Sequence, residues 1–141
     1  MTEQEYLDSK LTFNKKGIFL GKENIMWEYE KVWIKKQVRG LFNKHQPDSI
    51  LEIGFGLGHT ADEFQRLGVK RHVIVEPHPE IYKRALAWGK TEIINDFIQN
   101  LELDEEFNMI YDDRAEFVFN DFDLSKIKHK YYERWQPWQQ H

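Results

Sequence analysis

Four short apolar segments, each followed by glycine or an acid, alternate with amphipathic segments between residues 49 and 112. The apolar segments have the length of buried strands, and the segments after the first two have the apolar spacing of helices. Short connections between alternating strands and helices predict an α/β fold, with a parallel sheet in the order 3-2-1-4 and helices on both faces. The predicted strands are 49–53, 71–76, 91–94 and 108–111, and the predicted helices are 61–67 and 80–90.

The residues before the first strand divide into an arm and a helix. Residues 1–24 are polar and mixed, with few apolar anchors, and we interpret them as an N-terminal arm or lid. Residues 25–44 have helical apolar spacing, which predicts an amphipathic helix packed on the sheet. Residues 25–141 then form a single domain that begins with this helix. The apolar stripe of the helix starts with Met26, Tyr29, Val32 and Trp33.

The tail after the fourth strand mixes basic and aromatic residues, and its start at residues 123–125 resembles a helix cap. We expect a helix over 124–141. Such a mixture can bind single-stranded nucleic acid, but aromatic rings that pack on the domain beside lysines in solvent are the commoner arrangement. The fourth strand would be a sheet edge, and an exposed apolar edge favours aggregation. We therefore expect the tail or a homodimer to cover that edge.

Composition narrows the classes of function. The chain has 141 residues, 40% of them hydrophobic, which is enough apolar material for one folded domain. A formal net charge of −4 argues against extensive nucleic-acid binding. Cysteine is absent and the histidines lack the spacing of common metal sites, so we assign no metal. No apolar run reaches about 18 residues and the N-terminus lacks a signal-peptide pattern, so we expect no membrane partner and a cytoplasmic location.

The ends of the predicted strands carry glycines or acids. Gly54, Gly56, Glu76, Asp96 and Asp112 each follow or close a strand. Ligands of parallel sheets bind at the carboxyl ends of the strands, where the strand order reverses. Four strand ends that supply such residues to one rim predict a site for a nucleotide-like ligand.

The glycine loop, residues 54–58, has the spacing Gly54-x-Gly56-x-Gly58. This differs from the G-x-G-x-x-G of dinucleotide sites, which disfavours a dinucleotide. With Glu52 in front, the segment resembles motif I of class I S-adenosylmethionine-dependent methyltransferases. The resemblance implies a Rossmann-like methyltransferase fold, here lacking the usual last strands, with S-adenosylmethionine as cofactor.

In that family the loop wraps the methionine part of the cofactor. The acid that ends the second strand, here Glu76, accepts both ribose hydroxyls, since two carboxylate oxygens suit a cis-diol. Asp96 and Phe97 fall where the family contacts adenine. The residues expected to bind the cofactor are Met26, Glu52, Gly54, Phe55, Gly56, Gly58, Glu76, Pro77, Asp96 and Phe97.

One branch of these enzymes resembles the chain more closely, over about residues 18–114. Residues 51–56 are similar to the L-E-V-G-F-G of guanidinoacetate N-methyltransferases and related arginine methyltransferases, and residues 73–76 are similar to their W-I-I-E. Residues 20–30 resemble the upstream L-G-K-P-V-M-E-R-W-E of the branch, with one extra residue. Residues 110–112 match its L-Y-D.

The resemblance implies that Glu30 and Asp112 are the catalytic acids that hold the guanidino group of the substrate. A guanidinium offers a planar fork of N–H donors that pairs with carboxylates, and one carboxylate accepts a proton during transfer. Asp113 is the neighbour that could take the role of Asp112. The alternative interpretation is structural, with Glu30 a solvated helix acid and Asp112 a turn residue.

Three functions follow from these observations. The first is an N-methyltransferase that acts on a small guanidino compound or on an arginine side chain. The second is a non-catalytic relative that binds S-adenosylmethionine or a protein partner, because the segment after residue 112 does not resemble the remainder of a class I enzyme. The third and weakest is nucleic-acid binding through the basic and aromatic tail.

Overall fold

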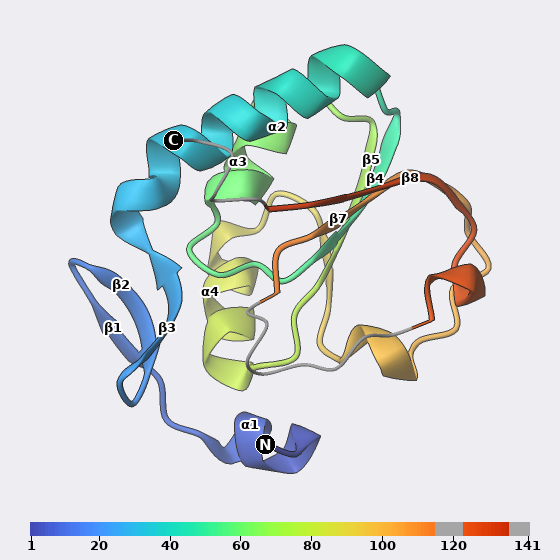
Figure 1. Ribbon diagram of the computed structural model, residues 1–141. Helices are drawn as coiled ribbons and strands as arrows, with labels where there is room; N and C mark the ends of the chain where they lie inside the picture. The colour runs from blue at the N-terminus through green and yellow to red at the C-terminus, as the bar shows by residue number, and fades with distance from the viewer. Residues whose placement is uncertain (115–122, 136–141) are drawn as a thin grey trace.

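A five-stranded parallel sheet forms the centre of the protein in the computed structural model, which describes residues 1–114 and 123–135 (Figure 1). The strand order is β6-β5-β4-β7-β8, so the first four predicted strands lie in the expected order and β8 is an additional neighbour of β7. The strands are β4 (Ser49–Ile53), β5 (Arg71–Val75), β6 (Glu92–Ile94), β7 (Phe107–Asp112) and β8 (His129–Arg134).

Both faces of the sheet are buried, which explains why its strands are nearly continuous apolar runs. On one face, side chains such as Ile50 and Ile74 pack with α2 (Lys31–His45), α3 (His59–Arg66) and α4 (Pro79–Trp88) (Figure 1). On the other face, Leu51, Val73 and their neighbours pack against the single turns η2 (Ile98–Asn100) and η3 (Leu124–Lys126). The prediction of a parallel α/β sheet is confirmed.

The N-terminal arm has regular structure. It begins with α1 (Glu3–Asp8), which has a Thr2–Glu5 capping box, and continues through β1 (Thr12–Asn14) and β2 (Gly17–Leu20). The predicted helix over 25–44 is wrong at its start. Residues 23–27 form β3, which pairs antiparallel with β2, and a single turn, η1 (Glu28–Glu30), precedes α2. Strand pairing and the burial of Met26 outweigh the helical spacing of this segment.

The predicted apolar stripe of the helix is also misplaced. Tyr29 and Val32 are 69% and 68% exposed, and the buried side chains of α2 are Ile34 and Val38. The predicted stripe is wrong because the helix starts only at Lys31, so that Met26 lies outside the helix. With 15 residues, α2 is the longest helix, and no helix in the described ranges is long and apolar enough to cross a membrane.

The predicted tail helix over 124–141 is wrong for its described part, and residues 136–141 lie outside the described residues. Residues 129–134 form β8, which pairs in parallel with β7. The strand forms because β7 would otherwise leave its backbone groups unpaired; Phe107 N–H donates to Lys128 O at 2.9 Å and Trp135 N–H to Asp112 O at 3.2 Å. The expectation that the tail covers the edge of β7 is confirmed.

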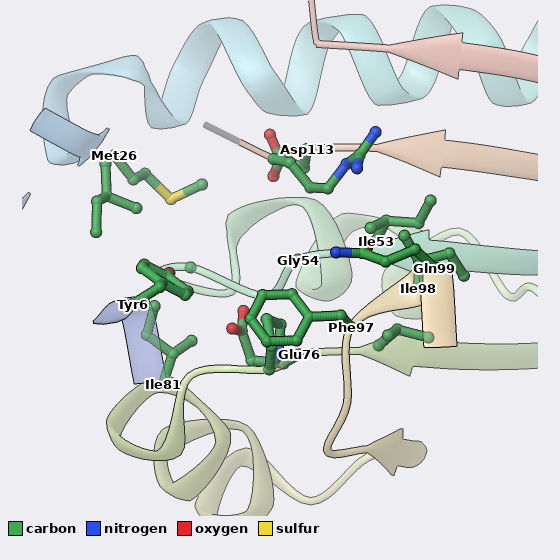
Figure 2. Close-up of a pocket in the computed structure, with 15 residues that line it drawn as sticks. Tyr6, Met26, Ile53, Gly54, Glu76, Ile81, Phe97, Ile98, Gln99 and Asp113 are labelled. Atoms are coloured by element: carbon green, nitrogen blue, oxygen red, sulfur yellow. The ribbon is translucent and has the colours of Figure 1, made fainter. Parts of the chain in front are cut away.

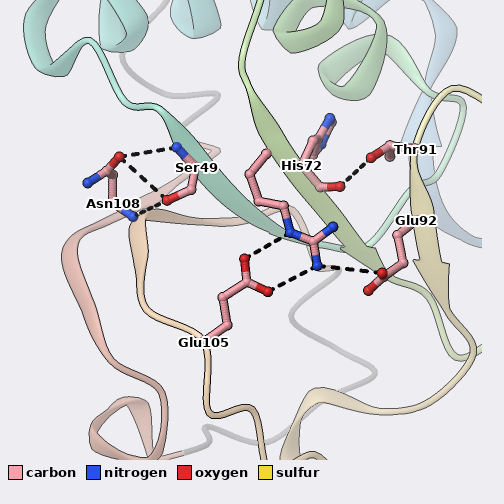
Figure 3. Close-up of polar contacts among 7 residues, drawn as sticks. Ser49, His72, Thr91, Glu92, Glu105 and Asn108 are labelled. Carbon is pink, nitrogen blue, oxygen red and sulfur yellow. Dashed lines mark hydrogen bonds and ion pairs between the residues drawn. The ribbon is translucent and has the colours of Figure 1, made fainter.

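The amino-terminal ends of the strands are joined by polar contacts far from the glycine loop (Figure 3). The amide oxygen of Asn108 accepts from the backbone N–H groups of Asp48 and Ser49 at 2.8 and 3.1 Å, and Asn108 N–H donates to the Ser49 hydroxyl at 2.9 Å. Arg71 forms an ion pair with Glu105 at 2.8 Å. The Asn108 contacts hold the start of β4 in register against β7.

Replacing Asn108 by Ala should lower the free energy of unfolding by about 1–3 kcal/mol, because two backbone N–H groups lose their acceptor. Asn108→Asp keeps an oxygen in place and is the matched control, with a smaller expected loss. Urea denaturation of both variants measures the difference. Equal stability of Asn108→Ala and the unsubstituted protein would contradict the role of Asn108 as the acceptor of these two N–H groups.

Candidate functional site

A pocket opens at the carboxyl ends of β4, β5 and β7 (Figure 2), with about 500 Å³ of space when the solvent at its mouth is included. The glycine loop, the end of β5, the η2 turn, β3 and α1 surround it, so the site lies where the order of the parallel strands reverses. Six of the ten residues expected to bind a cofactor line this pocket. They are Met26, Gly54, Gly56, Glu76, Pro77 and Phe97.

Glu76 follows β5, and its carboxyl is held by backbone N–H groups from two segments. One oxygen accepts from Phe55 N–H at 2.8 Å and the other from His78 N–H at 3.1 Å. Burial raises the pKa of Glu76 to about 7, although these hydrogen bonds favour the charged form. The Gly56 N–H is a third backbone donor to this carboxyl. The carboxyl lies at the wall of the pocket, where it can also accept from hydroxyls of a ligand.

The glycine loop follows a path that requires glycine. Gly54, Gly56 and Gly58 have φ angles of +93°, +58° and +85°. A Cβ at Gly56 would lie 2.7 Å from the terminal methyl of Met26, and one at Gly54 would lie 3.3 Å from the backbone oxygen of Asp113. The loop is therefore packed between β3 and the end of β7, and Gly54 and Gly56 bring its backbone to the wall of the pocket.

Glu52 lies beneath the loop, fully buried, and does not line the pocket. Its carboxyl contacts His72 Nε2 at 2.9 Å, and the Gln65 side-chain nitrogen lies 2.9 Å from His72 Nδ1. Burial raises the pKa of Glu52 well above its usual range and lowers the pKa of His72 to about 4. Burial thus disfavours the charged form of both groups, and Glu52 holds His72 in the core instead of facing the pocket.

Phe55, Gly58 and Asp96 also lie outside the lining of the pocket. Phe55 packs in the core, and a Cβ at Gly58 would lie 2.8 Å from its ring. Asp96 accepts from Phe97 N–H at 2.7 Å and from the Asn100 side chain at 3.1 Å, so its carboxyl is held beside the η2 turn. These three residues do not line the pocket, but they hold the glycine loop and the η2 turn, which do.

Sequence reasoning missed the contribution of α1. Tyr6 is 3% exposed, lines the pocket and lies with its ring 5.0 Å from that of His78 and 6.3 Å from that of Phe97. Burial and the nearby Glu76 raise the pKa of its hydroxyl. The Thr2–Glu5 capping box predicts a helix here, but no local pattern indicates where that helix packs. Ile25, Ile81, Ile98 and Gln99 are further lining residues that were not predicted.

The predicted catalytic acids lie beside this pocket. Glu30 is half-buried, its pKa is raised by burial, and it accepts from Trp27 N–H and from the Trp135 side chain. Asp112 is 1% exposed and is paired with Arg114 and Tyr132. Asp113 lines the pocket and Asp112 does not. Glu30 and Asp113 are close enough that the charge of Glu30 raises the pKa of Asp113.

Comparison with known sequences indicates one family. The family model described as guanidinoacetate N-methyltransferase matches residues 4–101. Protein arginine N-methyltransferase 2 of Gibberella zeae is 34% identical over 83 residues, which are 57% of this chain and 19% of that protein. The chain thus spans about a fifth of the length of this curated relative.

Two solved structures have a similar fold. DesVI of Streptomyces venezuelae superposes with a TM-score of 0.51 and 11% identity, over 60% of this chain and 37% of that one. A protein of Pyrococcus horikoshii whose proposed activity is RNA methylation superposes with a TM-score of 0.51 and 15% identity, over 92% of this chain and 64% of that one. The fold of the chain is therefore the Rossmann-like fold of methyltransferases.

The pH dependence of the unfolding free energy should reflect the raised pKa of Glu76. The folded protein holds a proton on Glu76 up to about pH 7, whereas the ordinary pKa of a glutamate side chain is 4.5. This group therefore stabilises the fold fully at low pH and loses that effect as the pH rises through 7. Relative to Glu76→Gln, the unfolding free energy of the unsubstituted protein should fall by roughly 3 kcal/mol between pH 4.5 and pH 8. Denaturant titrations across this range measure the difference, and parallel profiles for the two proteins would refute it.

Proposed function

The chain belongs to the guanidinoacetate N-methyltransferase family, and from that premise we propose that it transfers a methyl group from S-adenosylmethionine to a guanidino nitrogen. The observation that carries the proposal is the Glu76 carboxyl, held by the backbone N–H groups of Phe55, Gly56 and His78 at the wall of a pocket beside the glycine loop. A carboxyl so placed suits a ribose, and the apolar side chains around it suit an adenine ring.

The residues present fit the cofactor. The Glu76 oxygens have acceptor positions for the ribose hydroxyls, and Ile81, Phe97 and Ile98 provide apolar surface for the base. The backbone between Gly54 and Gly56 offers a wall without side chains for the methionine part. S-adenosylmethionine supplies a methyl group bonded to a positively charged sulfur. The carboxyl groups of Glu76 and Asp113 supply a negative environment for that charge.

The acceptor is proposed to be a guanidino group because acids collect at one end of the pocket. Asp113 lines the pocket, Asp112 and Glu30 lie close enough for their charges to raise its pKa, and a guanidinium pairs with carboxylates through parallel N–H donors. The family name and the name of the curated relative both specify guanidino substrates, guanidinoacetate and arginine respectively. A small guanidino compound and an arginine side chain share this chemistry, and we propose the class that contains both.

Cofactor binding is tested by calorimetric titration with S-adenosylhomocysteine. Glu76→Gln should weaken binding by about 10- to 100-fold, since a charged acceptor of two hydrogen bonds is lost. Glu102→Gln, an exposed acid on a connecting segment, is the matched control and should bind as the unsubstituted protein does. An absence of heat at millimolar ligand in the unsubstituted protein would reject the proposed cofactor.

Methyl transfer is tested with guanidinoacetate, free arginine and an arginine-containing peptide as acceptors. Glu30→Gln should lower kcat/KM by at least about tenfold because one charged partner of the guanidino group is lost, while Glu23→Gln, exposed on β3, should have little effect. Binding of S-adenosylhomocysteine without transfer to any acceptor would instead favour a non-catalytic relative that binds the cofactor.

A further inference from the structure

Two adjacent acids at the end of β7 have different environments. Asp112 closes the strand and is 1% exposed, and Asp113 follows it and lines the pocket. Asp113 lines the pocket together with Arg114, and Asp112 does not. The residues that contact each acid decide which one can bind a ligand there.

All the acceptor positions of Asp112 are already in use. Arg114 donates through Nε at 2.9 Å to one oxygen and through a terminal nitrogen at 2.7 Å to the other. The backbone N–H of Arg114 donates at 3.1 Å, and the Tyr132 hydroxyl on β8 donates at 2.6 Å. A carboxylate accepts about four hydrogen bonds, so these four donors saturate it. The pKa of Asp112 is lowered because these hydrogen bonds and the Arg114 charge outweigh its burial.

The partner of Asp112 is itself a guanidinium. Arg114 pairs with Asp112 through two parallel N–H donors, the geometry in which a guanidino substrate would bind a carboxylate. A substrate could reach Asp112 only by displacing Arg114 and leaving that side chain, whose exposed fraction is 10%, without its ion pair. Breaking a buried pair of this kind is costly.

Asp113 retains free acceptor positions. Among residues 1–114 and 123–135, the Thr60 hydroxyl is the one donor to its carboxyl, at 3.2 Å. Its backbone N–H donates to Ile53 O at 2.9 Å, which fixes the chain beside the glycine loop. Figure 2 shows the Asp113 carboxyl at the pocket, on the side that faces Met26. A ligand in the pocket therefore meets Asp113 before any other acid of β7.

We propose that Asp113, and not Asp112, is the carboxylate that binds the guanidino group and accepts its proton, while Asp112 is occupied by Arg114. This inference rests on the proposed function. As the bond from nitrogen to the methyl carbon forms, the bond from that carbon to sulfur breaks and its electron pair remains on sulfur. The proton leaves the same nitrogen for an oxygen of Asp113, so that a guanidinium gives a methylguanidinium and a protonated carboxyl.

The surroundings of Asp113 are consistent with this role. Burial raises the pKa of Asp113 well above its usual range, and the negative charges of Glu52, Asp112 and Glu30 raise it further, while the Thr60 hydroxyl opposes them. A cation in the pocket adds the opposite charge and favours ionisation. The carboxylate that results is surrounded by groups that make it a good proton acceptor.

The test compares Asp113→Asn with Asp112→Asn in the full chain, and Asp104→Asn, an exposed acid, is the matched control. Each protein is saturated with S-adenosylhomocysteine and then titrated calorimetrically with guanidinoacetate and, separately, with arginine. Asp113→Asn should bind S-adenosylhomocysteine within about twofold of the unsubstituted protein and the guanidino compound at least about tenfold more weakly. Its thermal stability should be unchanged or higher, because a buried acid is removed.

Arg114 gives a second readout in the unsubstituted protein, which does not depend on a variant that folds. The Nε–H resonance of Arg114 is followed by nuclear magnetic resonance while guanidinoacetate is added to the complex with S-adenosylhomocysteine. It should keep its position, because Asp112 stays paired. Release of Arg114 on binding, or a guanidino affinity that is lost in Asp112→Asn and kept in Asp113→Asn, would overturn the inference.

The proposed acceptor class and the assignment of Asp113 can be rejected separately. If the unsubstituted protein binds S-adenosylhomocysteine but neither guanidino compound, the proposed acceptor class is wrong and the inference falls with it. If it binds and methylates a guanidino compound and Asp113→Asn does so equally well, the acceptor class stands and the assignment of Asp113 is wrong.

Discussion

The Glu76 carboxyl connects the end of the second strand and the start of α4 with the glycine loop, which lies in a separate part of the sequence. It ends the second strand of the sheet, accepts from the glycine loop through Phe55 N–H, and accepts from His78 N–H at the start of α4. Because it is 3% exposed, its charge is costly in the absence of a ligand, and the pKa is raised to about 7. A ligand that donates two hydroxyls would stabilise the charged form, so binding and ionisation are linked.

Local patterns in the sequence predicted the sheet and its rim. The strand order follows from alternating apolar and amphipathic segments with short connections, and right-handed crossovers leave few other arrangements. Glu76 and the glycine loop were identified because turns that follow parallel strands gather at one edge. The positive φ angles of Gly54 and Gly56 are the physical reason for that part of the pattern.

Contacts between distant segments could not be predicted in this way. Met26 was expected near the cofactor by resemblance, but its place in β3 depends on pairing with Ile18, and Tyr6 reaches the pocket only because α1 packs on His78. The motif also could not distinguish Asp112 from Asp113. That distinction depends on Arg114, two residues further on, and on Tyr132 in a strand that the sequence suggested was a helix.

The central claim is that one pocket places a ribose on Glu76 and a guanidino group on Asp113. A crystal structure of the chain with S-adenosylhomocysteine and guanidinoacetate tests it most directly. The account predicts both ribose hydroxyls within hydrogen-bond distance of Glu76, a guanidino nitrogen within hydrogen-bond distance of Asp113, and Arg114 still paired with Asp112. A ribose placed away from Glu76, or a guanidino group bound to Asp112 with Arg114 displaced, would contradict it.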